Sequence, residues 1–340
     1  MTSLATHDEM PQPFDDYSRS FSRMRGQLVD GEGVRYTDFV RGLKPVYWRV
    51  YLDIGLRYAA WVGTVVVASV AQANGVSPFI VVPSAAVLIA MFSPAVHIHE
   101  ASHWNIASDR NTNDFLCNLL MSWIMGLEIK FYRKVHFDHH RHLGTVRDTE
   151  RSYFFPLNAM FILKGIIGIS VAQTLLGYLK RSGESHLPTG RVEKETHALG
   201  FAPIAVLASG VIIHGLIVVG LWYFGHTAAS AAWLIGVGVL IPLLGSIRQI
   251  LEHRMDDARS DIDYSEVDQG ACTRIFGDGL FAKLLGASGF NHHLLHHWDP
   301  QIPYTRLPEL ERFLNGTQMR DILDRRRSTY QAVFRQLFEK

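Results

Sequence analysis

Charged residues are distributed very unevenly along this chain of 340 residues. No Asp, Glu, Lys or Arg occurs from Tyr58 to Val96, and none occurs from Ala198 to Ile247. A helix in water needs polar surface in every one or two turns, so charge-free stretches of this length are hard to place in a soluble domain. Each stretch is about twice the ~20 residues that cross a bilayer as a helix.

Each apolar stretch is interrupted near its middle by residues that favour a turn. The first contains "QANGVSP", with Asn74, Gly75 and Pro78, and the second contains "FGHTAAS" around Gly225. Such breaks divide a stretch into two helices. A buried helix pair in a large soluble core is the alternative, and the length of both stretches argues against it. The pattern therefore predicts an all-α membrane protein with four transmembrane helices in two hairpins, with spans near 54–73, 79–97, 201–223 and 229–248.

Basic residues flank the hairpins, whereas both hairpin tips lack Lys and Arg. They are Arg41, Lys44, Arg49 and Arg57 before the first span, and Lys130, Arg133, Lys134, Arg141 and Arg147 between the hairpins. The positive-inside rule then predicts an inner-membrane protein whose termini and central region are cytoplasmic. We expect a cytoplasmic N-terminal segment (1–48), a membrane domain (49–310) and a cytoplasmic helical tail (311–340). The first apolar stretch begins about fifty residues into the chain, unlike a cleavable signal peptide.

Two further apolar segments are less regular. Residues 115–129 are too few to span, which indicates a re-entrant or interfacial helix. Residues 154–179 are interrupted by Lys164, and a fifth span there would separate the histidines described below onto opposite faces of the membrane. We therefore expect an in-plane helix at 154–179 and a polar loop at 180–196.

Net charge and cysteine content exclude several classes of protein. The formal net charge is +1, which indicates no nucleic-acid partner. Cys117 and Cys272 are far apart and form no C-x-x-C, so neither a disulfide framework nor an iron–sulfur module is expected.

Twelve of the seventeen histidines fall in four short places at or just beyond predicted helix ends. Residues i, i+3 and i+4 share one face of a helix, so one H-x-x-x-H pattern and two H-x-x-H-H patterns each present their imidazoles together. Imidazole is the commonest metal ligand in proteins. The twelve are His97, His99 and His103; His136, His139, His140 and His142; His253; and His292, His293, His296 and His297.

The number of histidines discriminates between kinds of metal site. "HEASH" (99–103) fits the zinc-protease signature H-E-x-x-H with Glu100 as base, but a catalytic zinc uses three protein ligands. A transporter would place its site near the bilayer midplane, where only His214 is expected. Two metals with four or five ligands each account for nine histidines: His99, His103, His136, His139, His140, His253, His293, His296 and His297.

The three histidine boxes around two hairpins resemble the membrane fatty acid desaturase and hydroxylase family over roughly residues 50–310. "HFDHHRHLGTVRDTE" is similar to that family's second box with its trailing acidic residues, and "NHHLLHHWDP" to its third box. "EHR" at 252–254 is similar to the extra histidine after the last span. The third box departs from the family pattern at Leu295, where Glu is common, and the doubled His292–His293 permits a slipped register.

The resemblance implies that the nine histidines hold two iron ions at the cytoplasmic face of the membrane, in a helical cap. Gln249, one turn before His253, is then a candidate neighbour of the centre, as are Glu100 and His292. Two ferrous ions would reduce oxygen to a species that removes hydrogen from an unactivated C–H bond. The expected product is a double bond in an acyl chain or lipid-like substrate. The alternative is hydroxylation of a lipid or a small specialised metabolite.

Electrons are expected to come from a separate ferredoxin-like or cytochrome donor. The sequence has no C-x-x-C, no G-x-G-x-x-G opening a βαβ unit and no HPGG haem-binding motif. Lys130, Arg133, Lys134 and Arg141 could attract an acidic carrier, although positive charge that sets topology explains them equally well.

Overall fold

The computed structural model describes residues 17–169 and 201–338, and this part of the chain is helical, with isolated β-bridges and no strand. The chain divides into two compact units, each described by itself below. The first unit comprises Met1–Val50, Lys134–Asn158 and Ser246–Lys340, and the second comprises Tyr51–Arg133 and Ala159–Gly245.

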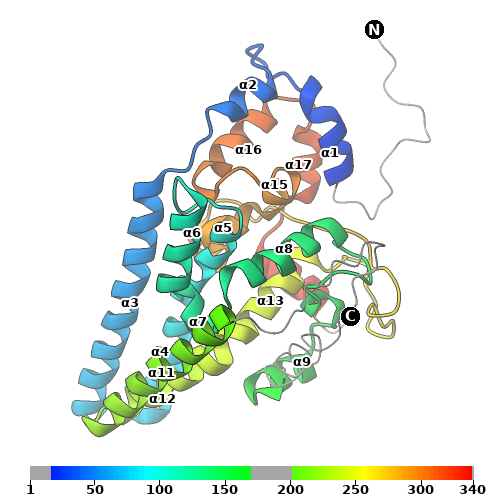
Figure 1. Ribbon diagram of the computed structural model, residues 1–340. Helices are drawn as coiled ribbons and strands as arrows, with labels where there is room; N and C mark the ends of the chain where they lie inside the picture. Colours follow the sequence, from blue (N-terminus) through cyan, green and yellow to red (C-terminus); the bar gives the residue numbers. More distant parts are fainter. Residues whose placement is uncertain (1–16, 170–200, 339–340) are drawn as a thin grey trace. The chain divides into compact units, whose positions relative to one another are not determined.

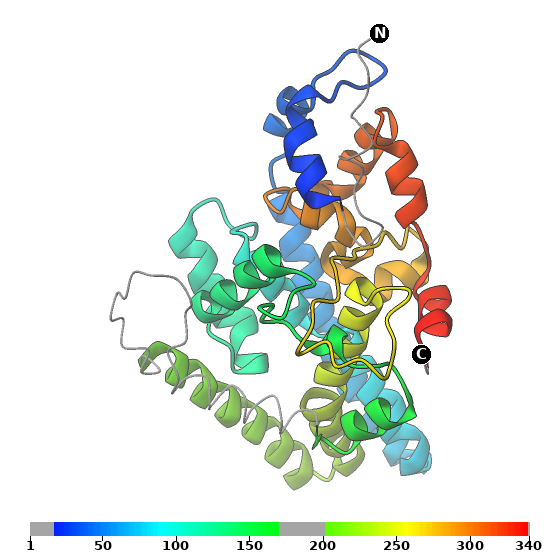
Figure 2. The same cartoon turned by 90° about the vertical axis from the view of Figure 1, so that its right-hand side faces the viewer.

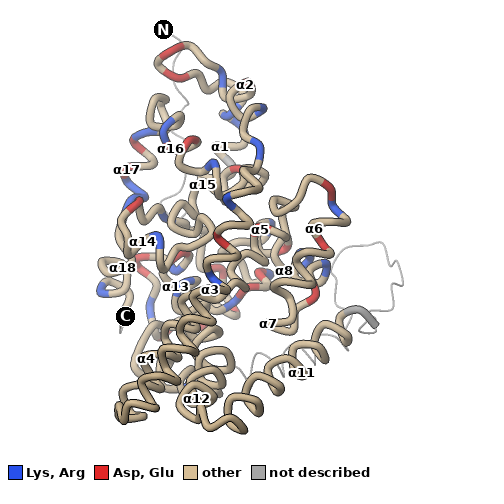
Figure 3. Tube along the Cα trace, turned by 90° about the vertical axis from the view of Figure 1, so that its left-hand side faces the viewer, with Lys and Arg blue, Asp and Glu red and all other residues tan. Residues whose placement is uncertain are grey.

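The predicted membrane-spanning helices are confirmed. Helix α3 covers Tyr47–Ala73, α4 covers Pro78–Met91 in an apolar segment that runs to Ser102, and α11 covers Phe201–Tyr223. The fourth candidate span, Thr227–His253, contains α12 (Thr227–Ile235), a π-helical turn (Gly236–Leu240) and α13 (Ile241–His253). Figure 3 shows α11 and α12 without any charged position. All four are long and apolar enough to cross a bilayer.

Small residues let the spanning helices of the second unit pack closely. A Cβ added to Gly236 would lie 2.9 Å from the carbonyl oxygen of Ala86, so only glycine permits this approach to α4. Trp61 of α3 is buried against Trp233 of α12, and its indole N–H donates to the carbonyl of Ile89 at 2.7 Å. Only 6% of the most apolar window of α11 is buried within the protein, as expected of a surface that faces lipid.

The apolar segment at 115–129 is bent rather than continuous. Helix α6 (Arg110–Cys117), a π-helical turn (Asn118–Ser122) and α7 (Trp123–Met125) precede α8 (Ile129–His142), and the two parts are bent by 80°. Gly126 has a φ of +65°, in the left-handed region. Beyond α8, the eight-residue helix α9 (Ala159–Ile166) is too short to cross a bilayer. The remainder of the expected in-plane helix and the polar loop at 180–196 lie outside the described residues.

The first unit packs its N-terminal segment against helices near the C-terminus (Figures 1 and 2). The helices are α1 (Ser18–Met24), α2 (Tyr36–Arg41), α14 (Leu280–Leu285), α15 (His293–Trp298), α16 (Leu307–Asn315), α17 (Arg320–Arg326) and α18 (Tyr330–Leu337). The Tyr36 hydroxyl donates to the carboxylate of Asp299 at 2.7 Å, and Arg25 pairs with the same oxygen at 3.3 Å. Phe21 of α1 stacks on Trp298. These contacts fix the segment that follows the third histidine box.

Helix α15 is anchored through its apolar face. Leu294 and Leu295 are fully buried in the core of the first unit, together with Phe21, Tyr36 and Leu310. Leu295, at a position where the family that the histidine boxes resemble commonly has Glu, is therefore a packing residue here. Because Leu295 faces this core, the histidines of α15 lie on other faces of the helix.

The turn after α8 requires glycine at 144. Gly144 has a φ of +76°, and an added Cβ would lie 2.3 Å from the carbonyl of Gly270. The Gly144 carbonyl accepts hydrogen bonds from the amides of Gln269 and Gly270, at 2.8 and 3.0 Å. This turn thereby ties the loop after the second histidine box to the segment after α13.

We expect Gly144→Ala to destabilise the first unit much more than Gly33→Ala. Gly33 also has a positive φ, +84°, but nothing lies within 4 Å of an added Cβ. Gly33→Ala should therefore cost only the backbone term, about 1–2 kcal/mol, whereas Gly144→Ala adds a clash with backbone atoms. The midpoint of thermal unfolding of the detergent-solubilised protein measures the difference. Equal midpoints for both variants would contradict the assigned clash.

Candidate metal centre

Seven of the nine candidate ligands lie in the first unit, on three elements. Six of them, all except the partly buried His140, are at most 7% exposed. Helix α8 presents His136, His139 and His140, α13 ends at His253, and α15 presents His293, His296 and His297. The structure therefore brings together histidines that are distant in the sequence, and it does so in two groups.

The first group contains His139, His253, His293 and His297. One ligand nitrogen of each lies within 4.8 Å of the others. Nε2 of His293 is 2.8 Å from Nε2 of His253 and 3.2 Å from Nε2 of His297. Four imidazoles from three elements thus direct nitrogen atoms at one small volume.

The second group contains His136, His140 and His296. Nε2 of His140 is 3.0 Å from Nε2 of His136 and 3.0 Å from Nε2 of His296. His136 and His140 are one helical turn apart on α8, and His296 comes from α15. Both groups therefore use the i, i+3, i+4 spacing of the two H-x-x-H-H boxes.

Hydrogen bonds at the outer nitrogens orient three of these rings. Nδ1–H of His136 donates to Glu150 at 3.1 Å, Nδ1–H of His139 donates to Asp148 at 2.9 Å, and Nδ1–H of His253 donates to the carbonyl of Cys272 at 3.0 Å. A neutral imidazole that donates from Nδ1 carries its lone pair on Nε2. The lone pairs therefore point into the clusters, which is the arrangement of metal-ligating histidines.

A second layer of contacts holds these carboxylates. The Tyr153 hydroxyl donates to Asp148 and accepts from the amide of Gly144 at 2.7 Å. The Gln249 side-chain amide donates to Glu150 at 2.6 Å. Gln249 therefore contacts the partner of a candidate ligand, through which it acts on His136.

Burial keeps His293 and His297 of the third box neutral. It lowers the pKa of His293 and of His297 well below the usual range, and the neighbouring imidazoles lower both further. Burial alone would raise the pKa of Glu150, but the imidazoles of His139 and His136 outweigh it and bring the value to about 2. Burial alone would lower the pKa of His139, but Asp148 and Glu150 raise it to about 9, so a metal at this ring has to displace a proton. The neutral rings of His293 and His297, together with rings held from behind by carboxylates, fit a divalent transition metal such as iron, zinc or copper.

His99 and His103 lie in the second unit, at the end of the segment that contains α4. Helix α5 (Ile98–Ser102) carries His99, and His103 follows it, with ring centroids 5.5 Å apart. Both are buried. Glu100 accepts a hydrogen bond from the Asn105 side chain at 3.2 Å, and its other oxygen is 3.4 Å from Nδ1 of His99. Glu100 thus contacts a candidate ligand.

Arg133 holds the end of α5 in place. Its guanidinium donates to the carbonyls of Ser102 and Ala101 at 2.8 and 3.1 Å, and it pairs with Asp114. Arg141 pairs with Asp138 at 2.7 Å. At least two of the four basic residues that could attract an acidic carrier therefore have partners within the protein.

His292 is directed away from both groups. Its Nδ1 is 2.7 Å from Glu311, and its Nε2 is 3.5 Å from Asp278. The structure thus places His293, and not His292, beside His253. This geometry favours the register that begins at His293 over the one slipped to His292.

Several residues around the histidines were not singled out from the sequence. Asp148 and Glu150 belong to the acidic residues that trail the second box, which is a usable signal. Glu252 precedes His253, and its carboxylate lies 3.8 Å from Nε2 of His293 while accepting from the Tyr330 hydroxyl at 3.2 Å. Tyr153 has no sequence signal, because its role depends on the turn at Gly144.

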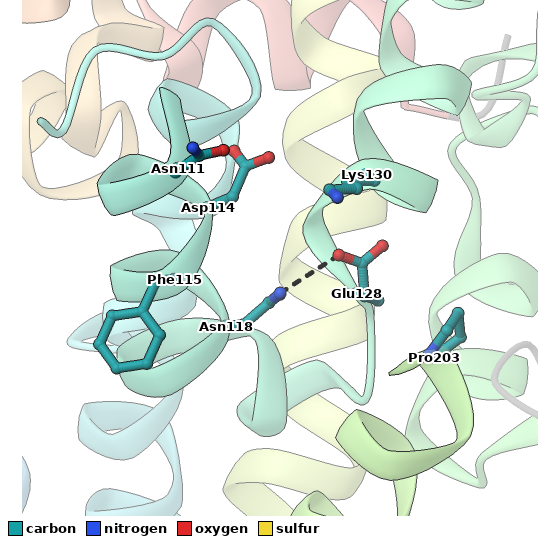
Figure 4. A pocket seen from close by; sticks show the side chains of 7 residues that line it. All are labelled: Asn111, Asp114, Phe115, Asn118, Glu128, Lys130 and Pro203. Carbon is teal, nitrogen blue, oxygen red and sulfur yellow. Dashed lines mark hydrogen bonds between the residues drawn. The ribbon is translucent and has the colours of Figure 1, made fainter. Parts of the chain in front are cut away.

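A polar pocket in the second unit contains none of the candidate ligands (Figure 4). Asn118 donates to Glu128 at 3.2 Å, and the other Glu128 oxygen accepts from the amide of Phe131 at 3.0 Å. Glu128 therefore caps the start of α8. The residues that line this pocket are Asn111, Asp114, Phe115, Asn118, Glu128, Lys130 and Pro203.

Comparison with known proteins supports the resemblance noted from the boxes. Residues 77–330 match a protein-family model described as fatty acid desaturase. All candidate site residues, from His99 to His297, and therefore all three boxes, fall inside this range. No protein of curated function matches the chain significantly.

We expect Asp148→Asn to weaken metal binding by about 10–100-fold, because an amide no longer holds the His139 ring through a charged hydrogen bond. Asp138→Asn is the matched control, since Asp138 lies beside His139 on α8 but pairs with Arg141. Metal content after dialysis against a graded chelator measures the effect. Equal retention in the two variants would contradict the orienting role of Asp148.

Proposed function

The chain belongs to the fatty acid desaturase family, and we propose that it is an oxygen-dependent, non-haem di-iron enzyme that introduces a double bond into an acyl chain or lipid-like substrate. Family membership supports an oxidoreductase of the desaturase and hydroxylase type, and the four apolar helices support an integral membrane protein. The identity of the metal as iron, the substrate and the orientation of the protein in the membrane are parts of the proposal.

One observation carries the proposal: two separate groups of imidazoles converge in the first unit. A group of four (His139, His253, His293 and His297) and a group of three are each large enough to define one metal. A single catalytic zinc needs only three protein ligands and would leave the other group unused. Two metal ions are therefore the simplest assignment that uses both groups of histidines.

We assign the four-histidine group to one iron and His136, His140 and His296 to the other. Three imidazoles leave the second iron with fewer ligands than the first, and His99 and His103 remain as a pair one turn apart. We propose that this pair completes the second set, giving five nitrogens against four. All nine histidines of the three boxes and of α13 then have a role.

When bound, the two ferrous ions would supply the reduction of oxygen to an oxidant that removes hydrogen from an unactivated C–H bond. The protein's own residues would orient and shield the centre. Asp148 and Glu150 hold the rings of His139 and His136 by charge-assisted hydrogen bonds. Burial of the histidines excludes water, which would otherwise quench a reactive oxidant.

Electrons would be delivered by a separate ferredoxin-like or cytochrome protein, since the sequence contains no motif for a bound redox cofactor. We place the termini and the metal centre on the cytoplasmic side of an inner membrane, from the distribution of Lys and Arg. An acyl chain that lies in the bilayer could reach a centre at this surface. We propose no nucleic-acid partner.

The purified protein should hold close to two irons per chain, and a host that expresses it should accumulate an unsaturated lipid. His139→Ala should abolish the product, because this residue belongs to the four-histidine group. Mass spectrometry of host lipids and metal analysis of the protein measure both. Purified protein with one tightly bound zinc and no iron would exclude the proposal, and a hydroxylated product would favour hydroxylation over desaturation.

Glu100→Gln separates this proposal from a zinc protease that uses "HEASH". An amide can still contact His99 and Asn105, so iron content should fall little. A protease would lose all proteolysis of membrane substrates in this variant. Proteolysis present in the parent protein and absent in Glu100→Gln would overturn the di-iron assignment.

Adjacent alanine substitutions test the register of the third box. His293→Ala should lose about one iron per chain, whereas His292→Ala should keep both, because His292 contacts Glu311 and Asp278 instead. Iron per chain in the two purified variants decides the matter. Loss of iron from His292→Ala with retention in His293→Ala would reverse the assignment.

A further inference from the structure

A buried carboxylate, that of Glu252, lies on the inner side of the four-histidine group. Glu252 is 1% exposed and directly precedes His253 at the end of α13. Its Oε2 is 3.8 Å from Nε2 of His293. Asp148 and Glu150, in contrast, contact Nδ1 atoms on the outer sides of their rings. Glu252 therefore lies on the side of an imidazole where a metal would bind.

The distance from Glu252 to His293 is compatible with a shared metal. Two ligand atoms at about 2.1 Å from one metal are about 3 to 4 Å apart, depending on the angle between the bonds, and the separation of 3.8 Å falls in this range. Glu252 does not, however, belong to the set whose donor atoms all lie within 4.8 Å of one another. The carboxylate thus borders the volume that the four imidazoles enclose.

The other oxygen of Glu252 is held in place by two side chains. The Tyr330 hydroxyl donates to Oε1 at 3.2 Å and lies 3.4 Å from the carbonyl oxygen of Phe290. Arg248, one turn earlier on α13, is 3.4 Å from the same Oε1. Because both contacts use Oε1, the carboxylate is oriented with Oε2 toward His293.

Tyr330 is the first residue of α18 and is itself fixed. It is 2% exposed, and its ring stacks on Phe276 with ring centroids 3.7 Å apart. Thr329 caps the helix, because its hydroxyl accepts from the amide of Ala332 at 3.1 Å. The amide of Phe276 donates to the carbonyl of Asn291 at 2.7 Å, just before α15. The start of α18 is thereby connected to the third histidine box.

A negative charge beside the four-histidine group suits a metal ion. Imidazoles bind metals in their neutral form, so a divalent ion among four of them keeps its full charge in a buried site. Such an ion favours the ionised form of a nearby carboxylate, and the attraction between them is strong where water is excluded. An ion pair with Arg248 is the alternative role of Glu252. The Arg248 side chain is 25% exposed, so solvent contributes to the stabilisation of its charge.

We propose that Glu252 is the charge partner of the metal in the four-histidine group, and that Tyr330 positions it. This inference rests on the proposed metal content of that group. It gives the C-terminal tail a role in the metal centre, although α18 (Tyr330–Leu337) extends beyond the residues that match the family model. The tail would act through one hydroxyl group.

Binding of Co²⁺ to the full-length, metal-depleted protein in detergent tests the charge of Glu252, by competition with a chelator. We expect E252Q to weaken binding of one of the two ions by about tenfold or more, because glutamine keeps the size and the acceptor oxygen but lacks the charge. The control E311Q removes another buried carboxylate, which contacts His292, and should have no such effect. Equal affinities of E252Q and the unaltered protein would overturn the proposal, as would equal weakening in both variants.

Tyr330→Phe tests the positioning. The ring can still stack on Phe276, so the variant should fold, but Oε1 loses a hydrogen-bond donor. The visible absorption spectrum of bound Co²⁺ should change, and its affinity should fall less than in E252Q. Tyr264→Phe is the control, since Tyr264 is also buried but its hydroxyl accepts from the amide of Arg259. A spectrum of Y330F identical to that of Y264F would refute the role of Tyr330.

Three outcomes separate this inference from the proposed function. Absence of metal binding by the unaltered protein would refute both. Two bound ions, with the same affinity and spectrum in E252Q and Y330F, would refute the inference alone. A lower unfolding temperature of E252Q with unchanged Co²⁺ affinity would restrict Glu252 to its pair with Arg248 and also overturn the inference. None of these readouts depends on catalysis.

Discussion

Buried imidazoles must be oriented by partners on their outer nitrogens, and a network of contacts in the first unit meets this constraint. Nδ1 of His136 and of His139 meets Glu150 and Asp148, and Nδ1 of His253 meets a backbone carbonyl. Each partner needs its own support, so Gln249 and Tyr153 hold the carboxylates and the turn at Gly144 holds Tyr153. A single orientation requirement thereby extends through successive layers into loops that touch no histidine.

The fold and the grouping of the histidines were largely readable from the sequence because both follow from simple periodicities. Charge-free stretches twice the length of a span admit few structures other than helical hairpins. The H-x-x-H-H spacing gathers three rings on one helix face wherever the helix goes. The four candidate spans agree with the structure, with α3 beginning at Tyr47 and therefore several residues earlier than expected. Apolar and aromatic residues before the predicted start extend that helix.

Other features depend on tertiary contacts that a local sequence pattern does not predict. The different directions of His292 and His293 follow from burial of Leu294 and Leu295, which fixes the rotation of α15, and from Glu311, which lies on another helix. Tyr153 acts through a turn whose close approach to Gly270 joins residues far apart in the chain. Arg133, read as a surface charge, instead caps α5 and pairs with Asp114. In each case the partner comes from a distant segment, so sequence spacing carried no information.

The contact between Tyr36 and Asp299 joins residues 263 positions apart, and the contact between His140 and His296 joins residues 156 apart. The ribosome synthesises the chain from its N-terminus. The second histidine box is therefore made before the third box and α16, and it cannot form its contacts with the third box until that segment has been made. The centre can therefore close only at the end of synthesis, after the last span has been inserted. The two groups of histidines are thus complete only in the finished protein, and the N-terminal segment, which is synthesised first, is among the last to reach its packed position.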